Sequence, residues 1–196
     1  MAYRIVELNE VQRLLRKKTI PARIIEKYQT WKDLVSNGGL PALRALPALN
    51  LHALKGQLEG LYTCYLTLQW RVIFAIDENE RVLLVTVHQV TAHHYKKAHD
   101  MNPQIRDSLN KVFESFRTPK GAKLARRNTK VSVGHTVRNL REFAGLTQAA
   151  LAKKADVQAS WLSAVENERV NLGTMGAKRL ARVLGVSPAF LLFPNG

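Results

Sequence analysis

Residues 146–167 read LTQAALAKKADVQASWLSAVEN, and the spacing of their apolar side chains predicts two short helices. Thr147 is a suitable N-cap for a helix over residues 148–155, because its hydroxyl can accept a hydrogen bond from a first-turn backbone N–H. Residues 156–157 form a tight break that leads into a second helix over residues 159–167. The C-terminal part of the chain therefore predicts a pair of short helices joined by a turn.

Further helices are predicted on both sides of this pair. Apolar residues recur at helical spacing over residues 133–144 and 175–184, and a last helical turn is expected at residues 188–192. Gly145 and Gly185 end the two longer helices, as glycine commonly does. Two short helices with such supports have the geometry of a helix-turn-helix module, in which the second helix enters the major groove of DNA. An all-α DNA-binding domain is expected here.

The first half of the chain mixes strand and helix patterns. Residues 3–8 alternate apolar and polar side chains as a half-buried strand does, and helices are predicted over residues 9–18 and from Pro21 to Gly38–Gly39. Three strands rich in β-branched and aromatic residues then follow, at residues 61–66, 70–76 and 82–87. This order predicts an α+β domain with a small antiparallel sheet covered by a helical pair.

The two predicted domains are separated by a helix and a basic segment. Residues 103–116 carry five apolar side chains at helical spacing, and residues 118–130 (TPKGAKLARRNTK) contain five bases and no acid, a composition typical of a linker. The predicted organisation is an α+β domain over residues 1–100, a connecting helix over residues 101–117, a basic linker over residues 118–132 and a helical domain over residues 133–196.

The composition favours a nucleic acid partner. The chain has 196 residues with 30 Lys and Arg against 15 Asp and Glu, a formal net charge of +15, and a pI near 10.3. Such a charge points first to a polyanion, although a solvated basic surface is the alternative. A single cysteine, Cys64, excludes an internal disulfide framework and is typical of the cytoplasm. No apolar stretch approaches the ~20 residues of a membrane span, so no membrane partner is expected.

Residues 134–192 resemble the Xre/Cro-type helix-turn-helix domain, of which HigA-like antitoxins are an example. The resemblance is carried by LREFAGLTQAALAKKADV at 140–157, WLSAVENE at 161–168 and RLARVLGVSPAFLL at 179–192. It implies that Gln148 and Asn167 hydrogen-bond DNA phosphates, and that Arg141 and Glu166 form a buried ion pair. The implied base-facing positions are Gln158, Ala159, Ser160, Ser163 and Ala164.

Three features of this segment affect DNA recognition. Two alanines among the base-facing positions leave thymine methyl contact and DNA shape to carry much of the specificity. Glu168 stands where the family usually has glycine, and Gln158 stands where a Ser or Thr cap is usual. Trp161 has two interpretations, either as a platform on the DNA backbone or as a side chain that packs against another surface.

Residues 3–97 resemble the RelE/HigB superfamily of toxins, small ribonucleases that cut messenger RNA on the ribosome. The segments that carry the resemblance are LKG at 54–56, GLY at 60–62, QWRVIF at 69–74, the strand at 82–87 and HHYKK at 93–97. The superfamily has the same strand–helix–helix–strands order as the pattern derived above. ParE-like relatives share this fold but act on gyrase, so the fold leaves the target open.

Metal-free RNA cleavage requires a base, an acid and cations that stabilise the phosphorane. The resemblance makes Arg71 the phosphate clamp and His93, His94 or Tyr95 the proton-transfer group, while the alternatives are a structural arginine and an exposed histidine pair. Lys55, Lys96 and Lys97 are candidates for binding the RNA backbone, or else are solvated surface lysines. No cluster has the spacing of a metal site, so neither a metal nor another cofactor is expected.

Taken together, the two resemblances suggest a fused type II toxin–antitoxin protein in the toxin-first order of HigB and HigA. The expected partners are operator DNA, messenger RNA on the ribosome and a second copy of the chain, with the helical domain repressing the protein's own promoter. Two alternatives stay open. One is a regulator whose toxin-like half is catalytically silent and serves dimerisation or effector contact, and the other is an active ribonuclease that the helical domain masks or positions.

Overall fold

The computed structural model describes residues 4–7, 9–16, 20–55, 59–76, 81–89, 123–124 and 129–195. The chain divides into two compact units, one of residues 1–24 and 50–126 (the sheet unit) and one of residues 25–49 and 127–196 (the helical unit). The predicted connecting helix over residues 103–116 lies outside the described residues. Among the residues that are described, no helix is long and apolar enough to cross a membrane.

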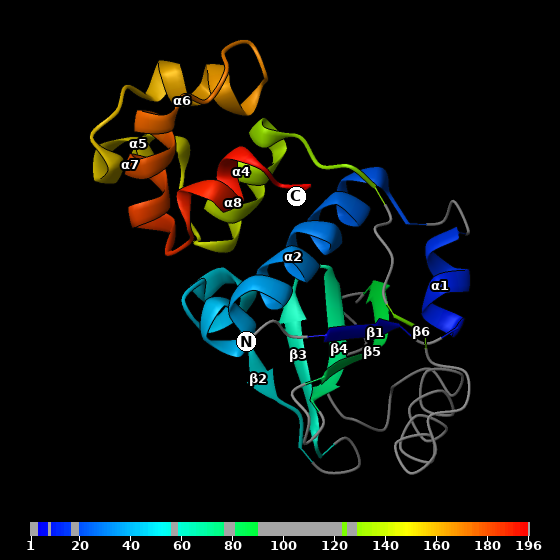
Figure 1. Cartoon of the computed structure of the whole chain (residues 1–196). Helices are drawn as coiled ribbons and strands as arrows, with labels where there is room; N and C mark the ends of the chain where they lie inside the picture. Colours follow the sequence, from blue (N-terminus) through cyan, green and yellow to red (C-terminus); the bar gives the residue numbers. More distant parts are fainter. Residues whose placement is uncertain are drawn as a thin grey trace. The chain divides into compact units, whose positions relative to one another are not determined.

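The sheet unit contains a six-stranded sheet with the order β2-β3-β4-β5-β1-β6 (Figure 1). Its strands β3, β4 and β5 pair antiparallel, in agreement with the three strands predicted from sequence. The short helix α1 (Asn9–Arg16) follows the first strand directly. The strands are β1 (Arg4–Glu7), β2 (His52–Ala53), β3 (Leu61–Tyr65), β4 (Trp70–Ile76), β5 (Arg81–Gln89) and β6 (Lys123–Leu124).

The sheet differs from the wholly antiparallel prediction at its β1 edge. Strand β1 runs parallel to β5, with Ile5 opposite Val82, and antiparallel to β6. The alternation of a four-residue strand reveals which face is buried but not the direction of the strand that will pair with it. Strand β6 itself lies inside the segment predicted to be a basic linker. The sheet is therefore mixed rather than antiparallel.

Helix α2 (Ala22–Arg44) begins in the sheet unit and runs for most of its length in the helical unit. Gly39 has φ 58° and ψ −152°, so the helix is interrupted at the position where the glycine pair predicted its end. It resumes with Pro41 in its new first turn, a position that suits proline because no intrahelical N–H is needed there. The 3-10 turn η1 (Pro47–Leu49) follows.

The rest of the helical unit consists of five helices that agree with the predicted bounds to within one residue. They enclose an apolar core whose side chains are almost wholly buried, including Val137, Leu140, Phe143, Leu151, Leu162, Val165, Leu180, Leu184 and Leu191. The helices are α4 (Val133–Phe143), α5 (Gln148–Ala155), α6 (Ala159–Glu166), α7 (Thr174–Leu184) and α8 (Pro188–Leu192).

Local hydrogen bonds explain where these helices begin and end. The side chains of Ser132, Thr147 and Ser187 each accept a first-turn N–H, as the predicted cap at Thr147 requires. Asp156 adopts a left-handed conformation (φ 52°) that ends α5 and turns the chain into α6. The amide of Asn195 donates to the Val131 carbonyl and accepts from its N–H, at 2.9 and 3.1 Å. This pair of bonds ties the end of the described chain to the start of α4.

Candidate nucleic-acid interface

Helix α6 has one buried face and one face open to solvent. Leu162 and Val165 are buried in the core of the helical unit. The positions expected to face bases lie on the other side of the helix, which leaves them available to a ligand. Gln158, Ala159 and Ser160 are exposed, and Ser163 and Ala164 are half-buried.

A buried carboxylate anchors the end of α6. Glu166 is fully buried, and it receives two charged hydrogen bonds from Arg141 of α4, Nε to Oε1 at 2.6 Å and Nη2 to Oε2 at 2.8 Å. The implied buried ion pair is therefore present. The hydrogen bond from Arg141 to Glu166 raises the pKa of Arg141 above its ordinary value. Arg141 also donates to the carbonyl of Leu146 at 2.9 Å, so it holds the loop that leads into α5.

The two implied phosphate contacts are both linked to this carboxylate, Gln148 directly and Asn167 through Arg138. The Gln148 amide, at the first position of α5, donates to Glu166 Oε2 at 2.9 Å. Asn167, directly after α6, accepts from Arg138 Nη2 at 2.7 Å, and Arg138 Nε lies 3.5 Å from Glu166 Oε2. We call Arg138, Arg141, Gln148, Glu166 and Asn167 the Glu166 cluster. It fixes the start of α5 and the end of α6 with respect to each other.

Arg138 is a member of this cluster that the sequence reasoning missed. Its Nη2 also donates to the main-chain carbonyl of Glu166 at 3.0 Å, so it binds the C-terminal end of α6 through two acceptors. The available signal was its spacing, because Arg138 and Arg141 are three residues apart and so share a face of one helix.

The structure describes the backbone at the two positions where the sequence departs from the Xre/Cro-type pattern, namely Gln158 and Glu168. Glu168 has φ 60°, a left-handed conformation that glycine adopts at little cost, and this accounts for the usual glycine at its position. Gln158 occupies the N-cap of α6 without a side-chain capping bond. Gly134 of α4 lies so close to α6 that a Cβ there would be 2.5 Å from the Val165 carbonyl oxygen. The two helices thus approach at a point that only glycine permits.

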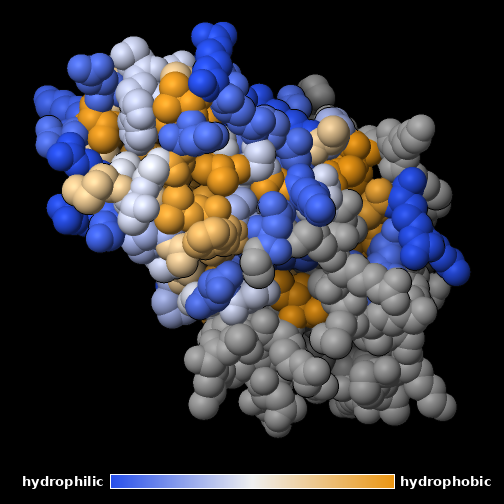
Figure 2. Space-filling model, turned by 45° about the horizontal axis from the view of Figure 1, so that its top comes forward, coloured by the Kyte–Doolittle hydropathy of each residue, from blue (hydrophilic) through white to orange (hydrophobic). Residues whose placement is uncertain are grey.

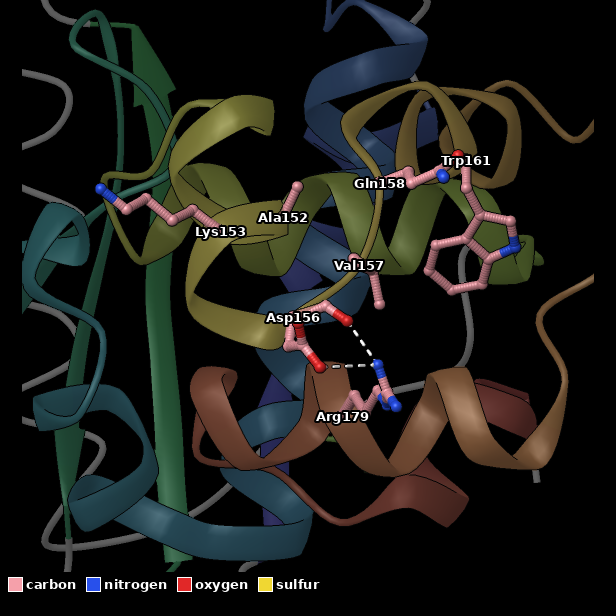
Figure 3. A pocket seen from close by; sticks show the side chains of 7 residues that line it. All are labelled: Ala152, Lys153, Asp156, Val157, Gln158, Trp161 and Arg179. Atoms are coloured by element: carbon pink, nitrogen blue, oxygen red, sulfur yellow. Dashed lines mark hydrogen bonds and ion pairs between the residues drawn. The ribbon is translucent and has the colours of Figure 1, made fainter.

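Trp161 packs against α7. A Cβ added at Gly176 would meet the Trp161 ring at 2.5 Å, so the indole lies directly over the start of that helix. Figure 3 shows the ring beside a shallow groove between α5, α6 and α7. On the other side of the groove Arg179 pairs with Asp156, with Nη1 and Oδ2 3.1 Å apart. Of the two interpretations of Trp161, the geometry supports packing against another surface.

The exposed charges around the helix-turn-helix are mostly basic. In Figure 2 hydrophilic residues surround the apolar patches of the face in view. Two exposed acids, Asp156 and Glu168, occur in this part of the helical unit. The exposed bases from α5 to α7 are Lys153, Lys154, Arg169, Lys178, Arg179 and Arg182. This balance favours a polyanionic ligand.

The sheet unit places one of its candidate catalytic residues in a cluster with two aromatic rings. Arg71 on β4 is 7% exposed, and its guanidinium lies 4.0 Å above the ring of Tyr65. Tyr65 makes an edge contact with His52 at 6.3 Å. Lys55 is exposed. The remaining candidates, His93, His94, Tyr95, Lys96 and Lys97, lie outside the described residues.

Residues 132–191 match the family model of a helix-turn-helix domain. The match covers α4 to α7 and nearly all of α8, so it coincides with the helices that form the Glu166 cluster. No curated protein and no solved structure matches the chain. The helix-turn-helix domain supports a role for the protein as a DNA-binding regulator.

Proposed function

We propose that this protein is a transcription regulator that inserts α6 into the major groove of operator DNA. The observation that carries the proposal is the Glu166 cluster, which holds Gln148 at the start of α5 and Asn167 just after α6 in fixed positions at the C-terminal end of α6. In this arrangement Gln148 and Asn167 bind phosphates on either side of the groove, while residues 158–164 face the base edges. The N-terminal N–H groups of α5 add their partial positive charge at one phosphate.

A dimer is the form in which such a module commonly reads DNA. Two copies of α6 would reach two half-sites about 34 Å apart, one helical turn of DNA. Val170 and Met175 in and beside the α6–α7 loop, and Phe193 after α8, are exposed and offer apolar surface to a second copy. Repression of the protein's own promoter is the regulatory role that we assign to this dimer.

The experiment that tests the proposal measures the DNA affinity of two glutamine-to-alanine variants, one at Gln148 in the proposed interface and one at Gln69 in the sheet unit. Gln148→Ala should weaken binding of the full chain to a duplex selected from a random pool, and should weaken binding to an unselected duplex by a similar factor, because a phosphate contact carries no sequence information. Gln69→Ala makes the same change at an exposed residue of the sheet unit and should leave both affinities unchanged. Affinity should also fall steeply with salt. Equal affinity of parent and Gln148→Ala in gel shifts would contradict the docking.

A ribonuclease toxin activity of the sheet unit is a second candidate. Arg71 supports it, because a guanidinium held over an aromatic ring is the type of cation that can stabilise a phosphorane. The full chain, incubated with translating ribosomes, should then cleave messenger RNA, and Arg71→Lys should lower the rate by about 100-fold or more. If the parent leaves ribosome-bound message intact, the regulator with a catalytically silent toxin-like half is the better description.

A further inference from the structure

The first turn of α6 is positioned by contacts with α7. The Glu166 cluster binds the C-terminal end of α6, while Gln158 at its N-cap makes no side-chain capping bond. Solvent reaches the first three base-facing positions, which are Gln158, Ala159 and Ser160. The N-terminal residues of a recognition helix are the ones that commonly contact base edges. The contacts that set the direction of this end of α6 therefore decide which bases it meets.

The first contact joins the Trp161 ring to Gly176 of α7. A Cβ built at Gly176 would lie 2.5 Å from Cη2 and 2.8 Å from Cζ2 of the indole, and 3.2 Å from Cδ1 of Leu172. The far edge of the ring thus lies against bare backbone, in a space that a methyl group would fill. Leu172 is 8% exposed, whereas Trp161 is half-buried and borders the open groove. The ring is consequently the group that has room to move.

The second contact is made by Arg179, three residues after Gly176 on α7. Its Nη1 donates to the main-chain carbonyl of Asp156 and lies 3.1 Å from the carboxylate oxygen Oδ2 of the same residue (Figure 3). Asp156 is the left-handed residue that turns the chain from α5 into α6. The ion pair is exposed and adds little stability by itself, but the bond to the carbonyl holds the backbone of the turn. Residues three apart share a helix face, so one face of α7 holds both the turn and the start of α6.

We propose that Trp161 and Gly176 are a specificity-determining pair, which positions the first turn of α6 for base readout. This inference rests on the proposed DNA-binding function. The phosphate contacts of Gln148 and Asn167 depend on the Glu166 cluster, at the other end of α6, and carry no sequence information. A shift of the Trp161 ring changes the direction of the N-terminal half of α6 and leaves those contacts in place. Sequence selectivity is then lost, while the general affinity for DNA remains.

Gly176→Ala in the full chain tests the proposal. Fluorescence anisotropy measures the affinity for a duplex that the parent selects from a random pool and for an unselected duplex of the same length, at a temperature where urea curves show that the variants are folded. We expect the first affinity to fall by about tenfold, the effect of one mismatched base pair, and the second by less than about twofold. Gly173→Ala is the matched control, because no atom lies within 4 Å of the Cβ that it adds, and it should keep the selectivity of the parent.

A double variant separates this pair from a general loss of stability. Trp161→Leu removes the two ring atoms that a methyl group at residue 176 would meet, so Trp161→Leu with Gly176→Ala should lose less selectivity than the two single losses added together. If Gly176→Ala does not fold, Trp161→Leu takes its place with the same tenfold expectation. Parent selectivity in the folded single variant, an equal fall in affinity for both duplexes, or single losses that add would overturn the proposal. A parent that selects no duplex would instead contradict the proposed function.

Discussion

At the scale of single residues, Glu166 joins two arginines and a glutamine from two neighbouring helices. Its carboxylate contacts Arg138, Arg141 and Gln148, and its side chain is fully buried. A buried ion pair adds little stability compared with apolar packing, because both charges lose their hydration. Removing one member of the pair lowers the stability strongly, because the remaining charge stays buried without its partner.

Glu166→Gln should therefore destabilise the protein severely. The change keeps the shape of the side chain but leaves two arginines without their shared anion, and we expect a loss of about 3–5 kcal/mol in the free energy of unfolding. Glu168→Gln is the matched control, because it makes the same change two residues further along at an exposed position, and it should alter stability by less than about 0.5 kcal/mol. Urea denaturation checks both values. Similar midpoints for the two variants would show that Glu166 is not the anchor.

The residue scale also shows what a sequence can and cannot reveal. Arg141 and Glu166 could be paired in advance because both lie in the segment that resembles the Xre/Cro-type domain, where the matching positions form a buried ion pair. That Arg138 lies on the same helix face as Arg141 could be predicted from their spacing of three residues alone. The bond from Asn139 to Thr30 joins residues 109 positions apart, and no local pattern in either segment identifies the other. Lys27 reads as a solvated lysine in sequence and becomes a buried cation only when α4 is present.

At the scale of elements, the distance between α4 and α6 is set by one missing side chain. Gly134→Ala would place a methyl group 2.5 Å from the Val165 carbonyl, so α4 and α6 must move apart. We expect a loss of about 1–3 kcal/mol, the usual cost of overpacking. Gly173→Ala is the control, since no atom lies within 4 Å of its added Cβ, and its effect should stay below about 1 kcal/mol. Thermal unfolding of both variants, followed by circular dichroism, measures the difference.

The elements themselves were largely predictable, but their partners were not. The helices of the helical unit follow from caps such as Thr147 and stop signals such as Gly185, which act over a few residues. Strands β3 and β4 follow from their β-branched and aromatic composition. The parallel pairing of β1 with β5 joins segments more than 70 residues apart, and the two residues of β6 are too few to carry a strand pattern. Local chemistry thus gives the elements, and long-range packing selects their neighbours.

At the scale of the whole molecule, the structural units do not follow the order of the chain. Residues 25–49 belong with residues 127–196, although residues 50–126 of the sheet unit lie between them in sequence. Ala48 lies 3.7 Å from the position of a Cβ at Gly145, and Ala45 lies 3.8 Å from that at Gly185. The domain boundaries near residues 100 and 133 stay a prediction from sequence. These contacts place the end of α2 and the turn η1 against the helix-turn-helix, within the helical unit.

A fragment of residues 127–196 should consequently be less stable than the same helices in the full chain. It lacks Thr30 and Lys27, the α2 partners of Asn139 and Glu142, and we expect its melting temperature to fall by about 5 °C or more. A peptide of residues 22–49 added in excess should raise it again by mass action. The same peptide with Lys27→Glu, which sets two negative charges against each other, should not. Differential scanning calorimetry gives these values, and equal melting of fragment and full chain would refute the expectation.

The place of α2 in the helical unit has a consequence for protein synthesis. Helix α2 ends at Arg44 and α4 ends at Phe143, so a ribosome adds 99 residues between them, which takes roughly 5–20 s in a cell. During that interval strands of the sheet unit are synthesised, and Lys27 and Thr30 of α2 do not yet have their partners Glu142 and Asn139 of α4. The contacts that join them span a long sequence separation, which slows folding. The nascent chain therefore completes its DNA-binding unit last, around a helix that it made among the first.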